Sequence, residues 1–512
     1  MEPLLNEIAS LTLDTSYSWV RMLIALGVSM FLSLFIGILA ARSKRAEKII
    51  IPIVDILQTL PILAFFPFAV YLVVTYLPGV IGINAAVIFL IVTSMIWNMI
   101  FGVYEAVKTL PSELTELGKL YGLSAYQKLR KIFIPASLPR LSEQMALSWA
   151  IGLFYLVTSE IFSVGNSKFA VNNGIGVALV NLGSSGNLTY YFVGIAIFIL
   201  FVVVTRLTLF EWFDRLANRY VLKQYGKSPS KKTMRFDGIF SKVFGLFSAF
   251  RLMKRKRHTN LEKPHRNRIV YACIIIVMVL FVGYVYLNHG ASSILRLTGY
   301  EYLSVLSLFV SLLRVWFAFL LVLAVAVPIS IYVVFMSKHK KSYLMMFQII
   351  ASIPATILLP LIVSALNKNG ELVALTIFFL SGLWYVIFSI IATTKYVPNN
   401  VMEVKNIFKV KGVTAWRKVY LKAIAPGLIT GGLTAIAAEW NASIIAEQFS
   451  GSTSGAVVSH VTTGIGRLLD TSLSSGNLTL MLVALVNMTV MIILLNKLVW
   501  KRLYERVSSV YK

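Results

Sequence analysis

The chain has 512 residues, of which 58% are hydrophobic and only 13% are charged, and its mean hydropathy is +0.79. This composition excludes an ordinary soluble domain and is typical of a protein that crosses the membrane many times. The net charge of +27 would favour nucleic acid as a partner of a soluble chain. Here the basic residues follow the membrane topology described below, so we expect no nucleic acid among the partners.

The chain repeats itself. The hexapeptide SSGNLT occurs at 184–189 and at 474–479, and each occurrence follows a GIG tripeptide. Arg21 pairs with Arg314 at a spacing of 293 residues. A spacing of 287 aligns further pairs, which are Trp97 with Trp384, Pro111 with Pro398, Glu116 with Glu403, Pro139 with Pro426 and Glu160 with Glu447. We therefore expect two tandem units, copy one at 17–225 and copy two at 302–512.

Each copy is predicted to contain five membrane helices. In chain order we expect them at 18–41, 49–76, 80–104, 141–163 and 190–210, and then at 310–335, 343–366, 372–394, 428–450 and 478–499. An outer segment at 1–16, a basic cytoplasmic linker at 226–268 and a connecting helix at 269–289 complete the chain. The predicted fold class is an all-α polytopic membrane protein, with two tandem five-helix bundles joined by an extra transmembrane helix, about 11 crossings in all.

The basic residues predict the orientation. With the N-terminus outside and the C-terminus in the cytoplasm, all but six of the 48 Lys and Arg residues lie on the inner side or at inner helix ends. Cytoplasmic loops carry such an excess of positive charge, and the cytoplasmic leaflet of the plasma membrane is anionic. The six exceptions are Arg21, Lys168, Arg296, Arg314, Lys368 and Arg467.

The cytoplasmic segment 116–139 is patterned as two amphipathic helices, although it lies outside the membrane. Gly122 is expected to end the first helix, and Ser124 to cap the second. We expect Pro135 and Pro139 to close the segment before the next crossing. A helix–turn–helix that faces the cytosol is typical of a docking element for another protein.

This segment resembles the EAA loop of ABC-importer permeases. Glu116 stands at the Glu position, Leu117 and Gly118 replace the two alanines, Gly122 matches the glycine, and Ile134 and Pro135 match the terminal pair. The resemblance implies a binding-protein-dependent permease with a five-helix core and no cofactor. It also implies two partners, an extracytoplasmic solute-binding protein and ABC ATPase subunits, either two copies or a pair, that receive the loop in a groove.

Copy two keeps only part of this pattern. Glu403 is retained, while Lys409 and Lys422 replace the glycine and the proline. Gly412 follows three residues after Lys409, and Pro426 lies in the APGL stretch beyond it. The stretch TAIAAEWNASIIAEQF at 434–449 further resembles duplicated permeases of nitrate/sulfonate-type anion importers, which implies a small anion as the solute.

Several polar residues fall within predicted membrane helices. Glu160 and Glu447 occupy equivalent places near the outer end of the fourth helix, where each either faces the transport pathway or packs between helices. Glu439, Asn441 and Ser443 belong to copy two alone, and they either line the pathway or bond between helices. Arg21 and Arg314 are expected to reach outward to the lipid headgroups.

Two other classes of function compete with the importer. A secondary transporter with parallel repeats would need coupling-ion residues at the membrane midplane, and the sequence offers few ionisable ones. A membrane enzyme would need a catalytic or metal constellation. The five histidines, His258, His265, His289, His339 and His460, form no ligand-spaced cluster, so we predict neither a catalytic nor a metal site.

Overall fold

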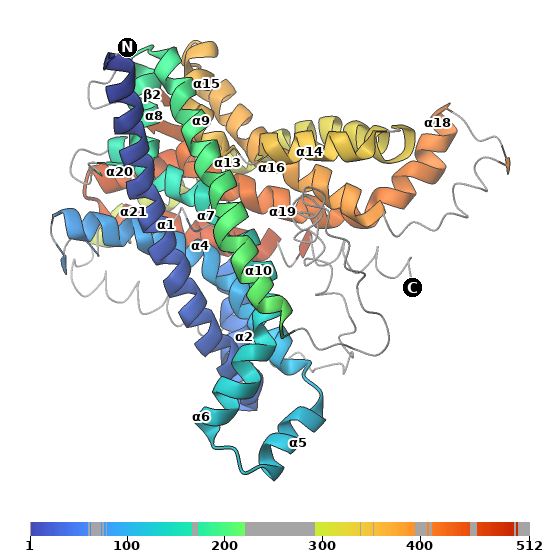
Figure 1. Ribbon diagram of the computed structural model, residues 1–512. Helices are drawn as coiled ribbons and strands as arrows, with labels where there is room; N and C mark the ends of the chain where they lie inside the picture. Colours follow the sequence, from blue (N-terminus) through green and yellow to red (C-terminus); the bar gives the residue numbers. More distant parts are fainter. Residues whose placement is uncertain are drawn as a thin grey trace.

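The computed structural model describes residues 2–59, 62, 73, 76–77, 79–165, 171, 173–220, 292–337, 339–351, 353–394, 407–408, 412–450, 458–495 and 498–499. Helices make up nearly all of these residues, as Figure 1 shows. The predicted linker 226–268 and the predicted connecting helix 269–289 lie outside the described residues.

Copy one contains nine described α-helices. These are α1 (Glu2–Arg42), α2 (Lys44–Thr59), α4 (Val80–Lys108), α5 (Ser112–Leu120), α6 (Ala125–Lys128), α7 (Ile134–Gly165), α8 (Ile175–Ser184), α9 (Leu188–Thr205) and α10 (Glu211–Asn218). Two π-helical turns, η1 (Leu129–Phe133) and η3 (Arg206–Phe210), join α6 to α7 and α9 to α10.

Copy two has its helices in the same order, and some of them are divided into shorter segments. Its helices are α13 (Ser292–Ile331), α14 (Lys340–Ala351), α15 (Leu359–Ala365), α16 (Gly370–Thr394), α18 (Gly412–Ala415), α19 (Leu421–Glu447), α20 (Ile465–Ser474) and α21 (Leu478–Leu495). The π turns η4 (Tyr332–Met336) and η6 (Trp416–Tyr420) and the 3₁₀ turn η5 (Ala355–Leu358) connect them. Strands β1 (Gln448–Ser450) and β2 (Val458–His460) form one antiparallel pair.

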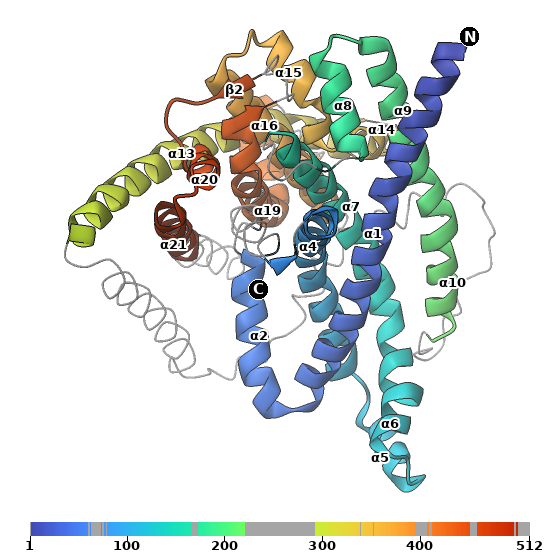
Figure 2. The same cartoon turned by 90° about the vertical axis from the view of Figure 1, so that its left-hand side faces the viewer.

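The third helix is the centre of each bundle. In copy one α4 packs between α1 and α7, and in copy two α16 packs between α13 and α19 (Figure 2). Both central helices are apolar around much of their circumference, which is the pattern of a helix buried by its neighbours. The first and fourth helices of each copy therefore meet the third along most of its length.

Seven helices in the described part of the chain are long and apolar enough to cross a membrane. Their outer faces carry exposed large apolar side chains, which would be unfavourable in water and are suited to lipid. On α1 these include Leu23, Ile24, Phe31, Phe35 and Leu39. The prediction of a helical, polytopic membrane protein is confirmed, and the sequence expectation of about 11 crossings includes segments outside the described residues.

The second helix of copy two is broken, as the prolines predict. Helix α14 ends at Ala351, Pro354 has an extended backbone conformation, and Pro360 begins the next helix after the 3₁₀ turn. Proline lacks the amide hydrogen that an α-helix needs, and it disfavours a helical residue before it. The predicted helix over 343–366 is therefore divided at its prolines into α14, η5 and α15.

The fourth helices begin earlier than predicted. Ile134 and Pro135 start α7 and do not close the loop, while Pro139 and Pro426 lie inside α7 and α19. A proline in the first turn costs little, because the first amides of a helix have no partner within it. The π turns η1 and η6, which lie at equivalent positions, lead directly into these helices.

The repeated SSGNLT motif makes the same turn twice. Gly186 and Gly476 have positive φ angles of 76° and 70°, a region that favours glycine. The side chain of Asn477 accepts a hydrogen bond from the Leu480 amide and caps α21. Asn187 occupies the equivalent N-cap of α9 without a side-chain bond to it.

Copy one and copy two contact each other through short elements. Helix α8 packs against η5 and α15, and α7 packs against η5 and β1. The Tyr191 hydroxyl donates a hydrogen bond to the Ile357 carbonyl, beside the break in the second helix of copy two. Gly183 lies so close to Pro360 that an added Cβ would stand 2.4 Å from the proline Cβ.

We predict that Gly183→Ala destabilises the chain by roughly 1–3 kcal/mol, because the new methyl group would push α8 away from Pro360. Gly27→Ala is the matched control, since nothing lies within 4 Å of a Cβ at that helical position. Thermal unfolding of both purified variants measures the difference. Equal unfolding temperatures for the two variants would contradict this account of the contact.

Candidate functional site

A buried polar cluster lies near the end of α7 in copy one. Arg21 Nη1 lies 2.7 Å from Glu160 Oε1, and the Ser18 hydroxyl donates to the same oxygen at 2.7 Å. Arg21 also donates to Asn84 Oδ1 at 2.6 Å and to the Asn173 carbonyl at 2.7 Å. The Glu160 side chain is fully buried, so its negative charge depends on partners inside the protein, among which Arg21 is the cation. We call this the copy-one node.

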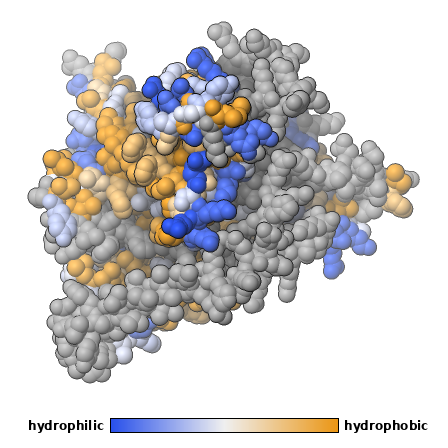
Figure 3. Space-filling view, turned by 90° about the horizontal axis from the view of Figure 1, so that it is seen from below, coloured by the Kyte–Doolittle hydropathy of each residue, from blue (hydrophilic) through white to orange (hydrophobic). Residues whose placement is uncertain are grey.

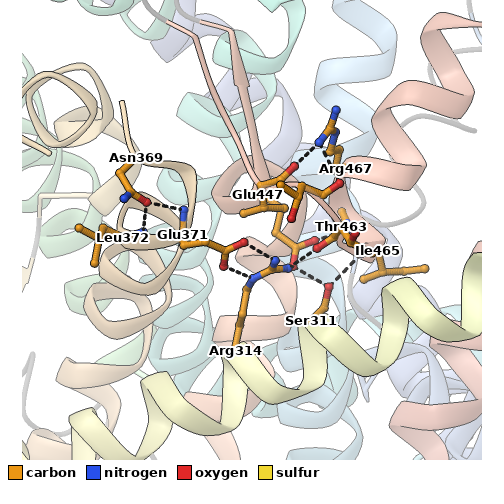
Figure 4. A network of polar contacts seen from close by, with 12 residues as sticks. Ser311, Arg314, Asn369, Glu371, Leu372, Glu447, Thr463, Ile465 and Arg467 are labelled. Carbon is orange, nitrogen blue, oxygen red and sulfur yellow. Dashed lines mark hydrogen bonds and ion pairs between the residues drawn. The ribbon is translucent and has the colours of Figure 1, made fainter. Parts of the chain in front are cut away.

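Copy two builds the same cluster from equivalent residues (Figure 4). Arg314 Nη1 lies 3.1 Å from Glu447 Oε1, and the Ser311 hydroxyl donates to that oxygen at 2.5 Å. Arg314 further donates to both oxygens of Glu371, each at 2.6 Å, and to the Thr463 carbonyl at 2.6 Å. This is the copy-two node, and each node joins the first, third and fourth helices of its bundle.

The duplicated GIG tripeptide forms one wall of each node. The Gly176 amide donates to Glu160 Oε2 at 2.8 Å, and the Gly466 amide donates to Glu447 Oε2 at 2.7 Å. A Cβ at Gly174 would lie 2.6 Å from the Glu160 carboxyl carbon, and one at Gly464 would lie 2.5 Å from that of Glu447. Glycine is required because any side chain would displace the carboxylate from its arginine.

The prediction that the two arginines reach outward to headgroups is wrong. Arg21 and Arg314 are 6% and 7% exposed, and both turn inward to a carboxylate. A buried Glu without a cation would be strongly unfavourable, and this outweighs the gain from exposing the guanidinium. Glu160 and Glu447 each bond to side chains of the first helix and to a backbone amide, and a place of either residue in the transport pathway stays a prediction.

Sequence reasoning missed four residues of the nodes, Ser18, Ser311, Asn84 and Glu371. The signal was present, because Ser18 and Ser311 differ by 293 and Asn84 and Glu371 differ by 287, the spacings already found for the repeat. The second pair is not conserved in charge. The copy-one node holds one cation and one carboxylate, whereas Arg314 stands between two carboxylates.

The three polar residues found only in copy two have separate environments. Asn441 Oδ1 accepts a hydrogen bond of 2.7 Å from the Ile62 amide of copy one, so this residue bonds across the copies. Ser443 and Glu439 are buried on α19, and neither side chain has a hydrogen-bond partner among the described residues. The structure does not bring Glu439 into contact with either node.

The predicted coupling loop of copy one is a compact pair of helices. Helix α5 ends at Leu120 and Gly122 has a φ of 62°, as a terminating glycine should. Ser124 and Gln127 form a capping box at the start of α6. Gly118 is buried against Ile132, whose Cδ1 would lie 2.9 Å from an added Cβ. Glu116 is exposed at the surface.

Both loops expose apolar side chains at equivalent positions. Leu120, Tyr121 and Tyr126 are 82%, 79% and 67% exposed, and the residues 287 positions later, Ile407, Phe408 and Val413, are 74%, 74% and 82% exposed. Glu403 lies outside the described residues, while Gly412 begins α18 with a φ of 59°.

The two loops lie apart in the molecule. Figure 1 shows α5 and α6 at its lower end and α18 at its right-hand edge. Seen from below, the described surface places hydrophilic and hydrophobic side chains next to each other (Figure 3). The two loops point in different directions in this conformation, and the expectation that both reach the same face of a bilayer stays a prediction.

Two tandem helical bundles, each with a buried polar node, define a multi-pass membrane protein, and copy one adds a helix–turn–helix outside its bundle. Residues 33–219 and 324–507 both match the family described as "Binding-protein-dependent transport system inner membrane component". Because these two segments cover well over half of the chain, the protein belongs to this family of ABC-importer permeases, with two permease domains in one chain.

Known permeases match stretches no longer than about one copy of this chain. The chain is 29% identical over 187 residues to the glycine betaine/proline betaine transport system permease protein ProW of Escherichia coli, covering 36% of this chain and 49% of that protein. It is 28% identical over 193 residues to the putative aliphatic sulfonates transport permease protein SsuC of Bacillus subtilis, with 38% and 63% covered. It is 25% identical over 153 residues to the nitrate import permease protein NrtB of Leptolyngbya laminosa, with 30% and 51% covered. The chain spans roughly half to two thirds of the length of these relatives.

We predict that Glu160→Gln destabilises the chain by roughly 3–5 kcal/mol, because it leaves the buried Arg21 without its carboxylate. Glu447→Gln should destabilise the chain less, because Arg314 keeps its ion pair with Glu371. Glu211→Gln is the control, since its exposed pair with Arg215 is worth about 0–1 kcal/mol. Thermal unfolding in detergent measures all three variants. A node variant as stable as the control would show that the buried pair is not needed for folding.

A second prediction concerns Asp470 on α20, which stands where copy one has Val180 at the spacing of 290. Burial raises the pKa of this carboxyl to about 6. A raised pKa means that the neutral form stabilises the fold at low pH and that this contribution is lost as the pH rises through 6. Asp470→Asn should therefore unfold at a higher temperature than the natural chain at pH 8 and at a similar temperature at pH 4. A pH-independent difference in unfolding temperature would contradict the assignment.

Proposed function

We propose that this chain supplies both membrane halves of an ATP-driven importer and carries a small solute inward, with the N-terminus outside and the C-terminus in the cytoplasm. Separate ABC ATPase subunits would bind the two cytoplasmic loops, and a solute-binding protein would deliver the solute at the outer face. Fusion of the two halves makes their pairing obligatory and raises their effective concentration.

The observation that carries the proposal is the matched apolar surface of the two loops. Three solvent-exposed apolar positions recur at a spacing of 287, although the loops differ at the glycine and proline of the motif. Large exposed apolar side chains mark protein contacts when they cluster on a rigid element. The capping box of α6 and the close contact of Gly118 with Ile132 supply that rigidity in copy one.

For the solute we propose a small anion of the nitrate or sulfonate type. The support is the resemblance of 434–449 to duplicated anion permeases, together with relatives named for aliphatic sulfonates, nitrate and bicarbonate. Other relatives are named for glycine betaine and trimethylamine N-oxide. Binding of both solute groups to the partner binding protein, measured by calorimetry, separates the alternatives. Tight binding of a betaine and none of the anions would overturn the anion proposal.

A topology experiment tests the arrangement of the halves. We expect Leu120→Cys and Ile407→Cys, each in a Cys273→Ser background, to react with a membrane-impermeant maleimide only after the cells are opened. Tyr76→Cys, at the exposed outer end of the predicted helix 49–76, should react in intact cells. Labelling of one loop residue from each side of the membrane would refute a shared cytoplasmic face.

A co-purification experiment tests the partner. We expect Leu120→Glu with Tyr121→Glu to reduce recovery of a co-expressed ABC ATPase at least tenfold, because charged side chains would be desolvated in an apolar groove. The pair Ile407→Glu with Phe408→Glu measures how much the second loop contributes to ATPase binding. Tyr76→Glu is the control at an exposed position outside both loops. Solute uptake that persists without any ATPase would favour the secondary transporter.

A further inference from the structure

The fourth and third helices of copy two enclose a carboxyl group that the nodes do not use. Glu439 on α19 is fully buried, and neither of its oxygens has a hydrogen-bond partner among the described residues. It lies eight residues before Glu447, which places it about 12 Å further into the bundle from the copy-two node. A lone charge at such a depth is strongly unfavourable, and buried acidic residues in membrane helices usually have a function.

A comparison with copy one shows how the space for this side chain arose. At the spacing of 287, Glu439 corresponds to Gly152, and its neighbour Gly382 on α16 corresponds to Met95 on α4. A Cβ at Gly152 would lie 3.0 Å from the Met95 sulfur, whereas a Cβ at Gly382 would lie 2.4 Å from Glu439 Oε1. The two copies have exchanged the large and the small residue across the same helix contact.

The exchange conserves volume but replaces a thioether with a carboxyl group. The gap beside Gly382 is filled by Glu439, so the carboxyl is built into the packing of α16 against α19. Two further buried hydroxyls without partners in the described part are Ser443, one turn along α19, and Ser381, next to Gly382. At the spacing of 287, Ser443 corresponds to Leu156 of copy one, whereas Ser381 corresponds to Ser94.

The other charged groups on the elements around Glu439 bond to other residues, are exposed, or lie far from Glu439. Arg314, Glu371 and Glu447 bond to one another in the copy-two node. On α20, Arg467 donates to the carbonyls of Val461 and Thr462, and Asp470 makes no hydrogen bond to α19 among the described residues. Glu301 on α13 and His460 on β2 are exposed.

Toward the loop, Arg417, Lys418 and Lys422 lie 17 or more residues from Glu439, about 25 Å or more along the helix. Tyr385 on α16 makes no hydrogen bond to Glu439 among the described contacts.

We propose that Glu439 is a proton-binding site, neutral when α16 and α19 are in contact. No cation pairs with this carboxyl among the described residues, so a bound proton is what makes its burial tolerable. Separation of the two helices would admit water to the carboxyl, which would then release the proton. A protonated side chain thus favours the closed contact, and an ionised one favours the open contact. Copy one has no equivalent, because Met95 and Gly152 form the same contact without a titratable group.

Infrared spectroscopy of the purified full-length chain in lipid nanodiscs tests the protonation state directly. The difference spectrum between the natural chain and Glu439→Gln at neutral pH should contain the carbonyl band of one neutral carboxylic acid. Loss of a carboxylate band in its place would overturn the proposal. This readout needs no ATPase or solute, so it stands or falls independently of the importer assignment.

A double variant provides the matched control. Glu439→Gly with Gly382→Met installs the copy-one pair in copy two, and it should fold and lack the carboxylic acid band. We expect the natural chain to lose several degrees of unfolding temperature between pH 6 and pH 9 relative to both Glu439→Gln and this double variant. Dicyclohexylcarbodiimide, which reacts with protonated carboxyls in apolar surroundings, should modify Glu439 and leave Glu160 and Glu447 unmodified. Equal pH profiles in all three chains would refute a proton site at this contact.

Discussion

A carboxylate buried near the end of the fourth helix has to meet a cation, and both halves of this chain are arranged around that requirement. The cation is an arginine of the first helix, and a residue of the third helix accepts further hydrogen bonds from this arginine. A backbone amide of the short helix that follows the fourth donates a hydrogen bond to the carboxylate. Four elements that are distant in sequence are thereby fixed at one point in each bundle. The apolar contacts along the helices are less specific, because many registers bury similar area.

The nodes also explain why short sequence motifs recur in a chain whose helices have diverged widely. Apolar side chains can be exchanged in lipid-facing or packed positions with modest effects. A backbone amide that bonds a buried carboxylate, and a glycine that allows its approach, tolerate almost no change. The tripeptide GIG is therefore retained, while most surrounding positions differ between copy one and copy two. The turn SSGNLT is retained for a separate reason, the positive φ angles of Gly186 and Gly476.

Much of the fold could be predicted from the sequence, and the limits are physical. Hydropathy and the repeat indicated a tandem helical membrane protein, and Gly122 with Ser124 indicated the end of one loop helix and the start of the next. The inward turn of Arg21 and Arg314 could not be predicted, because a basic residue near a helix end has two favourable environments and only the tertiary structure selects one. The early start of α7 at Ile134 was missed because proline is read as a helix breaker, although it is tolerated in a first turn. The bond from Ile62 to Asn441 depends on how the copies meet, which no local pattern contains.

The exchange of Met95 and Gly152 for Gly382 and Glu439 has a consequence for how such a chain can change over generations. Two large residues at this contact would clash and two glycines would leave a void, so either single step from one arrangement to the other passes through a less stable protein. In a symmetric dimer of identical subunits, the first substitution would destabilise this contact in both subunits at once. In a tandem chain the intact half keeps the molecule folded while the other half passes through the intermediate, which opens mutational routes that a homodimer cannot take.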